Sequence, residues 1–382
     1  MKIGIACGGT GGHIFPGLAA GRVLRERGHE VVLWMAGRPG EDLALAGWDG
    51  PVAKVAARPL SSKNPFALVA YFMSIAGSVI KCHTAMRRMK PDVLLAMGSY
   101  ASVAPSLGAA LSRVPFLLHE ANVIPGRAVR FLSRWAAAVA VSFKETSRHL
   151  SHRRIVPTGM PIRWSVANPG ENDPSEGSLQ VAGSIGTGRM EGLIPGRFTV
   201  LVMGGSRGAR RLNEIAASAL VRLYGRARAL QVIHLAGRDD EKSVRQVYLD
   251  AGMPAAVFGF LDDMPLAYRN ASVAVCRSGA STCAELSFFG VPALLVPYPF
   301  AIYKHQTANA NALAMDGSAD MCDEQILTAD WLADYLWKLM GDPGRLKCMR
   351  ESALKRFTPE DPASALADLV ELIGRSACGG HL

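Results

Sequence analysis

The chain has 382 residues, 49% of them hydrophobic, and its 39 glycines and 22 prolines are typical of an α/β protein with two domains rather than one core. Its seven cysteines include no C-x-x-C pair, which excludes a disulfide framework and indicates reduced thiols in a cytosolic protein. The net charge of +10 comes from residues 1–164, which contain 21 Lys and Arg but only 8 Asp and Glu. This excess of positive charge favours an anionic partner, such as a nucleic acid, an acidic lipid or a phosphorylated substrate. The alternative is a basic face that is merely solvated.

A glycine loop at residues 8–12 connects the first expected strand, residues 2–6, to a helix expected over residues 14–27. The strand is too short for a signal peptide. Such a turn aims backbone N–H groups and the positive end of the helix dipole at one point, which favours a phosphate; a tight turn without a ligand is the alternative. Ile14 stands where the dinucleotide fingerprint has its third glycine, and no Lys-Ser or Lys-Thr pair follows as in a P-loop, so neither cofactor class fits.

Alternating strand and helix signals continue to about residue 162 and predict a doubly wound parallel sheet. The expected strands cover residues 2–7, 30–36, 51–57, 92–98, 115–120, 137–143 and 154–159. His119, Glu120 and Asn122 lie at the carboxyl end of a strand, where open α/β sheets bind ligands, and Asn122 is suited to orienting a sugar hydroxyl. Arg163 ends this half near the expected interdomain cleft and is suited to pairing with phosphate. A structural role is the alternative for Asn122 and for Arg163.

An apolar segment of another kind lies at residues 65–80, between Lys63 and Lys81. Its 16 residues fall short of the roughly 20 that span a bilayer as a helix. It suits either a core helix or an interfacial helix whose basic side chains meet anionic headgroups. The side chains that would enter the lipid are Phe66, Tyr71, Phe72 and Met73.

Residues 165–195 are rich in Gly, Ser, Pro, Asn and Glu and are expected to be a linker. The first pattern then begins again, because an apolar strand at 198–203 leads into a second glycine loop at 204–208 and a helix, which predicts two similar domains. Ser206 stands there in a G-x-S-x-G pattern, and a hydroxyl donor to phosphate is preferred to a nucleophile. Further elements are expected as strands at 230–237, 256–261, 272–279 and 291–299 and as a helix at 362–374.

The strongest local constellation is the run of small residues at 277–282, which follows a strand and can open a helix with hydroxyls and N–H groups facing a diphosphate. Glu285 follows one turn later and is suited to accepting hydrogen bonds from two ribose hydroxyls; a capping or surface acid is the alternative. No D-x-D, H-E-x-x-H or paired C-x-x-C motif occurs, so neither a metal nor a cofactor is expected.

Eight motifs in one order cover nearly the whole chain and together resemble the MurG family of peptidoglycan glycosyltransferases, which move N-acetylglucosamine from UDP to undecaprenyl-linked muramyl-pentapeptide (lipid I). The motifs are GGTGGHIFPGLA (8–19), MGSYAS (97–102), HEANVIPG (119–126), TGMPIR (158–163), GGSRGARRLN (204–213), GFLDDM (259–264), CRSGASTCAE (276–285) and HQTANA (305–310).

The resemblance implies a GT-B fold, in which two Rossmann-like, doubly wound parallel-sheet domains face each other across a cleft. Residues 1–163, with a C-terminal helix at about 358–382, would form the domain that faces the membrane and binds lipid I. Residues 164–196 would be the linker, and residues 197–357 would bind UDP-N-acetylglucosamine. The enzyme would be a peripheral protein of the cytoplasmic face of the bacterial cell membrane, held on anionic lipid through residues 65–81, with no nucleic-acid partner. Its product, lipid II, would serve cell-wall synthesis, cell shape and division.

The same resemblance assigns residues to the two substrates, without a metal. The donor-binding residues would be Thr10, Gly11, Gly12, Arg163, Ser206, Leu261, Ser281, Thr282, Glu285, His305 and Gln306, of which His305 and Gln306 would contact the sugar. The acceptor-binding residues would be Gly9, His13, Tyr100 and Asn122. The chain departs from the family's usual pattern at Ser99, Tyr303 and Lys304, where a glycine and acidic or polar residues are usual.

His13 is the candidate general base for attack of the muramyl C4 hydroxyl on the anomeric carbon, with inversion, because a histidine can accept a proton near neutrality. A structural or phosphate-binding role for His13 is the alternative. Two rival functions also remain: a UDP-sugar epimerase with the same fold, and a non-catalytic nucleotide- or lipid-binding protein.

Overall fold

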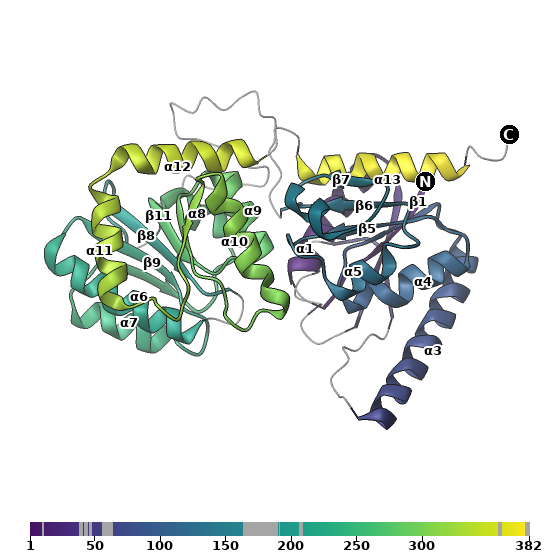
Figure 1. The fold of residues 1–382 in the computed structure, drawn as a ribbon, viewed down its shortest axis with the longest axis horizontal. Helices are drawn as coiled ribbons and strands as arrows, with labels where there is room; N and C mark the ends of the chain where they lie inside the picture. Colours follow the sequence, from purple (N-terminus) through teal and green to yellow (C-terminus); the bar gives the residue numbers. More distant parts are fainter. Residues whose placement is uncertain are drawn as a thin grey trace. The chain divides into compact units, whose positions relative to one another are not determined.

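The structure, a computed structural model, describes residues 1–9, 11–37, 41, 45, 48–55, 64–162, 190, 192–205, 209–357 and 361–378. The chain divides into two compact units (Figure 1). Unit 1 comprises Met1–Val166 and Thr358–Leu382, and unit 2 comprises Ala167–Phe357. The linker expected at 164–196 lies almost wholly outside the described residues.

Unit 1 is built on a parallel sheet of seven strands in the order β3-β2-β1-β4-β5-β6-β7. All seven strands expected from the sequence are confirmed: β1 (Lys2–Ala6), β2 (Glu30–Met35), β3 (Val52–Lys54), β4 (Val93–Ala96), β5 (Phe116–Glu120), β6 (Ala138–Val141) and β7 (Ile155–Pro157). The central strands are buried on both faces, which is why they are continuous apolar runs rather than alternating ones.

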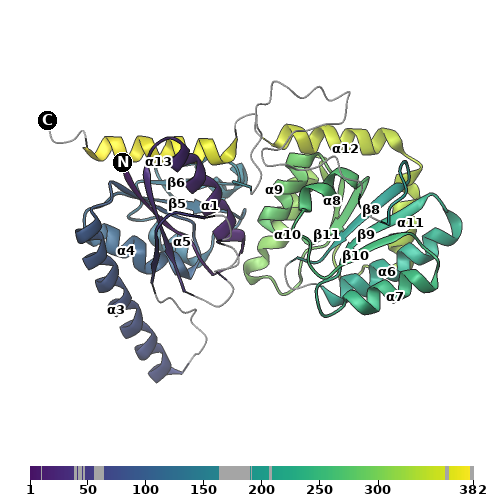
Figure 2. The same ribbon diagram turned by 180° about the vertical axis from the view of Figure 1, so that it is seen from behind.

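Helices cover both faces of this sheet (Figure 2). α1 (Gly11–Glu26) and α13 (Pro362–Cys378) pack on one face, and α3 (Pro65–Met89), α4 (Val103–Leu111) and α5 (Arg127–Leu132) pack on the other. Two short 3-10 helices, η1 (Tyr100–Ser102) and η2 (Lys144–His149), follow β4 and β6. α1 begins three residues before the expected residue 14, because Gly11 and Gly12 form its first turn.

The apolar segment at 65–80 is the first part of α3, a helix of 25 residues. Val79, Cys82 and Met86 are buried against the rest of unit 1, whereas Met73 and Ile80 are 70% and 64% exposed. No side chain described between residues 70 and 78 is buried, so this stretch is not a core helix, and it extends away from the sheet in Figure 1. Within the described parts of the chain, no helix is both long and apolar enough to cross a membrane.

Unit 2 repeats the plan with a parallel sheet of six strands in the order β10-β9-β8-β11-β12-β13. The strands are β8 (Phe198–Met203), β9 (Leu230–Leu235), β10 (Ala255–Phe258), β11 (Val273–Cys276), β12 (Ala293–Leu295) and β13 (Ala319–Met321). The first five were expected. The sequence analysis missed β13, because it has only three residues and a charged one, Asp320, at its centre.

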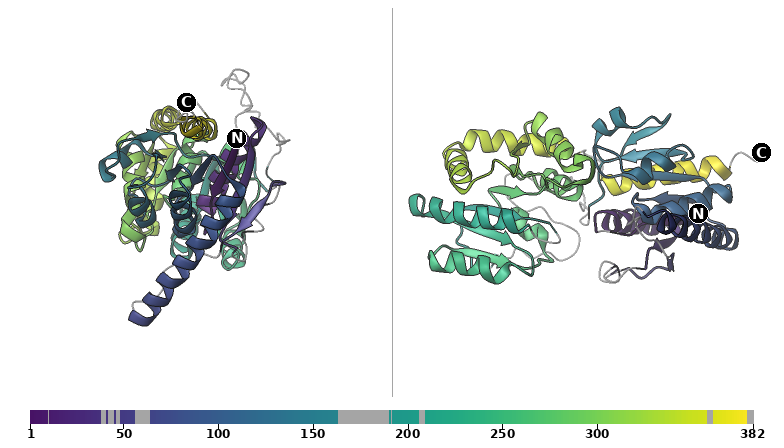
Figure 3. Two further views of the ribbon diagram at one scale, coloured as in Figure 1. Left: turned by 90° about the vertical axis from the view of Figure 1, so that its right-hand side faces the viewer. Right: turned by 60° about the horizontal axis from the view of Figure 1, so that its bottom comes forward.

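The sheet of unit 2 is likewise covered on both faces, as the right-hand view of Figure 3 shows. One layer consists of α6 (Arg210–Arg226), α7 (Glu241–Asp250) and α11 (Ala329–Met340). The other consists of α8 (Met264–Asn270), α9 (Ala280–Phe289), α10 (His305–Met315) and α12 (Pro343–Arg356), and the 3-10 helix η3 (Ile302–Lys304) precedes α10. The doubly wound parallel sheet expected of each half is therefore confirmed.

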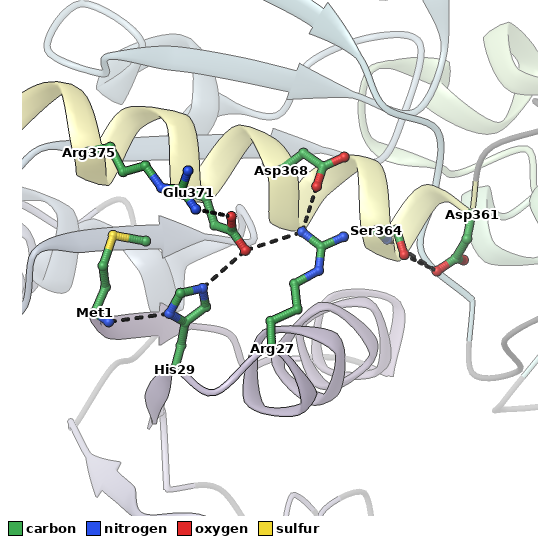
Figure 4. Close-up of polar contacts among 8 residues, drawn as sticks. All are labelled: Met1, Arg27, His29, Asp361, Ser364, Asp368, Glu371 and Arg375. Carbon is green, nitrogen blue, oxygen red and sulfur yellow. Dashed lines mark hydrogen bonds and ion pairs between the residues drawn. The ribbon is translucent and has the colours of Figure 1, made fainter.

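α13 is held on unit 1 by an apolar face and by a group of charged side chains. Leu366, Val370 and Ile373 are buried in the core beneath it. Arg27, in the turn after α1, pairs with Asp368 at 2.5 Å and with Glu371 at 3.2 Å, and His29 lies 3.0 Å from Glu371 (Figure 4). Glu371 thus links the last helix of the chain to the turn between α1 and β2.

Replacing Glu371 by alanine is expected to lower the melting temperature of unit 1 by about 2–4 °C, because roughly 1 kcal/mol of charge-assisted hydrogen bonding is lost from a site that is only 15% exposed. A matched control is Asp334→Ala, since Asp334 pairs with Arg226 on the open surface, both about 60% exposed. The control should leave the melting temperature nearly unchanged. Equal effects of the two substitutions would contradict a specific role for Glu371.

The contribution of Glu371 should depend on pH. Burial raises its pKa, but hydrogen bonds from His29 and Arg27 outweigh burial and leave the pKa below its ordinary 4.5. Because the folded pKa is the lower one, the stabilisation is complete above pH 4.5 and is lost as the pH falls through the folded value. Thermal melts of the wild type and Glu371→Gln should therefore differ at pH 7 and converge in acid.

Candidate functional site

The first glycine loop lies where the strand order of unit 1 reverses, between the neighbouring strands β1 and β4. Ligands of open α/β sheets bind outside the carboxyl ends of the strands at such a point. Gly9 has φ +92°, and a Cβ there would lie 3.0 Å from the hydroxyl of Tyr100, so the close approach of this ring requires glycine. The loop after β1 and the start of η1 thus meet at one edge of the sheet.

A buried carboxylate holds this loop. Oε1 of Glu41 accepts a hydrogen bond of 3.1 Å from the N–H of Gly9, and Oε2 accepts one of 2.8 Å from the N–H of Gly37. Glu41 is 6% exposed. In this structure the N–H of Gly9 therefore faces Glu41, while Gly11 and Gly12, which are expected donor contacts, form the first turn of α1.

His13, in the first turn of α1, is held by the loop after β4. Its Nδ1 lies 2.8 Å from the carbonyl oxygen of Met97. A carbonyl oxygen only accepts, so Nδ1 carries the proton and Nε2 of the neutral ring is an acceptor. Burial lowers the pKa of His13 below its ordinary 6.5, and the hydrogen bond to Met97 offsets part of that effect. The ring is therefore neutral near pH 7 and able to accept a proton at Nε2.

His119, a histidine on β5, is more deeply buried and has different hydrogen-bond partners from His13. It is 1% exposed, and its Nε2 lies 3.3 Å from the carbonyl oxygen of Gly159 and 3.2 Å from the hydroxyl of Ser142. Burial lowers its pKa to about 4, with the hydrogen bond to Gly159 acting against burial and the charge of His13 acting with it. His119 is a neutral structural residue that ties β5 to the segment after β7.

Ser99 compensates for the absent third glycine of the loop after β4. Its φ of +62° is unfavourable for a residue with a side chain. The hydroxyl donates to the carbonyl oxygen of Gly8 at 3.0 Å and accepts from the N–H of Ala101 at 3.2 Å. These two bonds hold the loops after β1 and β4 together.

Glu120 organises the loop that carries Asn122. Oε1 of Glu120 accepts from the N–H of Asn122 at 2.9 Å and from its amide at 3.3 Å, and Oε2 accepts from the N–H of Gly126 at 2.9 Å. Burial raises the pKa of Glu120, and these hydrogen bonds partly counter the effect. Asn122 is thereby fixed at the same edge of the sheet as Gly9, His13 and Tyr100.

In unit 2 the corresponding edge is formed by β8 and β11, and α9 begins there. The N-cap residue of α9 is Gly279, which has no side chain and so makes no side-chain cap of its own. Ser281 and Thr282 lie half-buried in this first turn. The arrangement is suited to an anion, as in the phosphate sites of many helices.

Glu285, one turn further along α9, has a partner that the sequence analysis missed. The hydroxyl of Tyr268, a fully buried residue of α8, donates to Oε2 of Glu285 at 2.6 Å. Burial raises the pKa of Tyr268 well above its ordinary value, and the charge of Glu285 adds to this. The phenol hydroxyl of Tyr268 thus orients the carboxylate of Glu285.

The structure also brings Gln306 to the loop after β11. The hydroxyl of Ser278 donates to the carbonyl oxygen of Gln306 at 2.8 Å, and the amide of Asn309 donates to the carbonyl oxygen of Ser278 at 3.1 Å. Gln306 and His305 begin α10 directly after Tyr303 and Lys304, whose φ angles are +54° and +52°. Two consecutive left-handed residues turn the chain sharply into this helix.

The remaining candidates divide into two groups. Leu261 is half-buried in the loop before α8, two residues ahead of the N-cap Asp263. Thr10, Arg163 and Ser206 lie outside the described residues. No group of three or more His, Cys, Asp or Glu side chains that could hold a metal occurs in the described parts of the chain.

Three features of these sites were not predicted from the sequence: Glu41 as the partner of Gly9, Tyr268 as the partner of Glu285, and a buried ion pair between Arg277 and Glu324. No spacing rule could have found them, since each lies 17 or more positions along the chain from its partner. For Arg277 one signal was available, because an arginine directly after a buried strand needs a nearby acid.

Both halves of the chain match glycosyltransferase family 28. Residues 3–141 match the "Glycosyltransferase family 28 N-terminal domain", and residues 199–363 match the "Glycosyltransferase family 28 C-terminal domain".

Curated relatives match over nearly their whole length. The chain is 38% identical to the UDP-N-acetylglucosamine–N-acetylmuramyl-(pentapeptide) pyrophosphoryl-undecaprenol N-acetylglucosamine transferase of Bordetella petrii, over 97% of each chain. It is 35% identical to the enzyme of the same name from Hahella chejuensis, over 93% of this chain and 94% of the relative. The crystal structure of Acinetobacter baumannii MurG matches with a TM-score of 0.73 and 27% identity over 97% of this chain and 99% of that one. With its two parallel-sheet α/β units of the GT-B class, the chain belongs to glycosyltransferase family 28 and, within it, to the MurG family.

Proposed function

We propose that this chain is an inverting N-acetylglucosaminyltransferase that moves N-acetylglucosamine from UDP-N-acetylglucosamine to the C4 hydroxyl of lipid I, forming lipid II. The relatives carry this activity in their names. The observation that carries the proposal is His13, a neutral histidine whose Nδ1 is fixed on Met97 at the switch point of unit 1 and whose Nε2 can accept a proton.

Unit 1 would bind the acceptor. The glycine loop after β1, through Gly9, would meet the acceptor with His13, Tyr100 and Asn122, while Gly11 and Gly12 would contact the donor. Unit 2 would bind the donor, with α9 opening on the diphosphate and Glu285 on the ribose. Thr10, Arg163 and Ser206 remain part of this proposal as contacts of the donor phosphates, and Leu261 remains part of it as a backbone contact of uracil.

The proposed mechanism needs a base for the acceptor hydroxyl and charge stabilisation for the leaving diphosphate. His13 would remove the proton of the C4 hydroxyl as that oxygen attacks the anomeric carbon from the face opposite UDP, which turns an α linkage into a β linkage. The N-terminal N–H groups of α9, together with Thr282 and Arg163, would stabilise the charge that grows on the departing diphosphate. The proton ends on His13 and the electron pair of the broken bond ends on UDP.

A membrane-facing surface on unit 1 supports a lipid-linked acceptor. The exposed apolar side chains are Met73, Ile80, Leu111, Phe131 and Trp135, on or next to α3, α4 and α5, which cover one face of the sheet. Exposed basic side chains accompany them: Lys81, Arg87, Arg88, Arg113, Arg130 and Arg134. Such a mixture suits the interface of a bilayer with anionic headgroups, at the cytoplasmic face of the bacterial membrane, where UDP-sugars are available.

The wild-type chain is expected to transfer labelled N-acetylglucosamine to a lipid I analogue and to release UDP only when the analogue is present. His13→Ala should lower kcat by about 10² to 10⁴-fold, the usual contribution of a general base. Because burial lowers the pKa of His13 in the free protein, the acid limb of the wild-type kcat/KM profile should lie below pH 6.5. Product formation by the two proteins across pH 5–9 is the measurement.

Three other results would be informative against this assignment. UDP release without lipid I, with no labelled product, would point to an epimerase. Neither product nor UDP release would point to a binding protein. An intact kcat in His13→Ala with a raised KM for lipid I would give His13 a binding role instead.

Glu285→Ala is expected to raise KM for UDP-N-acetylglucosamine about 10 to 100-fold, since hydrogen bonds to a carboxylate are worth roughly 1.5–3 kcal/mol each. KM for lipid I should change little. Tyr268→Phe, which removes only the hydroxyl that orients Glu285, should raise the same KM by a smaller factor. Equal changes in both KM values would rule out the ribose assignment.

The double substitution Ile80→Glu with Lys81→Glu should move the protein off vesicles that contain anionic lipid, because it removes one apolar contact and reverses a charge worth about 1 kcal/mol near the surface. A matched control on unit 2 is Leu249→Glu with Lys242→Glu, since Leu249 is 63% exposed, close to the 64% of Ile80. Vesicle flotation should separate the two variants. Unchanged flotation of the α3 variant would remove this face from the proposal.

A further inference from the structure

Arg277 and Glu324 form a buried ion pair in unit 2 that the chemistry proposed above does not use. Nη2 of Arg277 lies 2.5 Å from Oε1 of Glu324, and the two side chains are 9% and 7% exposed. Arg277 directly follows β11 and Glu324 follows β13, so the pair spans β12, which lies between them in the sheet. Burying two charges costs several kcal/mol of desolvation, so such a pair is weak evidence for stability and calls for another role.

The other hydrogen bonds of Arg277 reach the loop after β12. Nη1 lies 3.2 Å from the carbonyl oxygens of both Val296 and Pro297, and the guanidinium lies 5.5 Å from the centre of the Tyr298 ring. One planar group therefore contacts three consecutive residues of this loop. Glu324, bonded to the other nitrogen, keeps the guanidinium in the orientation that these contacts need.

This loop in turn fixes the side chain of Gln306. The N–H of Tyr298 lies 2.8 Å from Oε1 of Gln306. Because a backbone N–H only donates, the amide oxygen must face the loop, and the Nε2 group, a pure donor, is directed elsewhere. The hydroxyl of Ser278, the residue after Arg277, holds the backbone of Gln306 at 2.8 Å.

The loop has little packing of its own on one side. A pocket of about 430 Å³ opens there, bounded by Arg211, Arg277, Tyr298 and Phe300 among others. Phe300 is 80% exposed. Without Arg277, the carbonyl groups of Val296 and Pro297 would lose a buried partner, and the loop would have room to move into the pocket.

We propose that Arg277 and Glu324 are positioning residues that keep the amide N–H₂ of Gln306 directed at an oxygen of the donor sugar. The inference rests on the proposed function, in which Gln306 contacts that sugar. The terminal torsion of a glutamine is broad and roughly two-fold, so an amide released by Tyr298 can turn over and present an acceptor where a donor is required. The pair therefore sets affinity for the sugar half of the nucleotide sugar and not for the nucleotide half.

The test is a double-mutant cycle on the full chain, read out as affinity for UDP and for UDP-N-acetylglucosamine by calorimetry. Gln306→Ala and Arg277→Met are each expected to weaken UDP-N-acetylglucosamine binding about tenfold, the worth of one hydrogen bond, while UDP binding stays within about twofold. The double variant should bind no more weakly than Gln306→Ala alone, because Arg277 acts through Gln306. Glu324→Gln, which preserves shape, should give a smaller loss with the same selectivity and serves if Arg277→Met does not fold.

A matched control is Asp316→Asn, which breaks an ion pair with Arg356 at the other end of α10. The control should lower stability without changing the ratio of the two affinities. Additive losses in the double variant, or an equal loss of UDP affinity, would overturn the positioning role. A wild-type chain that binds UDP-N-acetylglucosamine but transfers no sugar would overturn the proposed function and leave the positioning role standing on the binding data.

Discussion

The parallel pairing of β1 with β4, repeated by β8 with β11, is the constraint on which both candidate sites depend. In unit 1 the register sets Ala6 opposite Ala96, so the loops leave the sheet at one level and Met97 reaches His13. In unit 2 the register sets Met203 opposite Cys276, and the N–H of Arg277 donates to the carbonyl oxygen of Met203. A slip of one residue would turn each strand's side chains to the other face of the sheet and would separate these groups.

Buried carboxylates then give the loops their shape. Glu41 accepts hydrogen bonds from backbone N–H groups of two different loops, Glu120 accepts them from two positions of one loop, and Glu324 bonds to the guanidinium of Arg277. A carboxylate has several lone pairs, so one side chain can satisfy donors of separate loops that no strand or helix would pair. The cost of burying the charge is offset only when all partners are in place, which makes each loop conformation close to all-or-none.

Most of the fold could be predicted from the sequence, because apolar runs and glycine turns report directly on burial and on backbone freedom. The twelve expected strands formed, and the repeat of the glycine loop correctly indicated two similar units. β13 could not be predicted, because three residues with a central aspartate carry no periodic hydrophobic signal.

The segment 65–80 could be recognised from the sequence as an apolar helix. Its direction away from the sheet depends on which of its residues α4 covers, and that is decided only when the unit packs. The contact between Tyr268 and Glu285 could not be predicted from the sequence for the same reason, because the two side chains meet only after α8 and α9 have packed.

The two glycine loops have glycines at matching positions and differ in charge and in the presence of a proton acceptor. Aligned on their glycines, His13 of the first loop corresponds to Ala209 of the second, which is followed by Arg210 and Arg211. Unit 1 thus has a group that can take a proton, and unit 2 has only a methyl group there and positive charge beyond it. Since a leaving diphosphate needs charge stabilisation and an attacking hydroxyl needs a base, these differences fit the division of tasks in the proposed function. Under the proposed function, Gln306 would need external support, because selectivity for the sugar in unit 2 would depend on a neutral amide, and an amide discriminates only while its oxygen and nitrogen are held in distinct orientations.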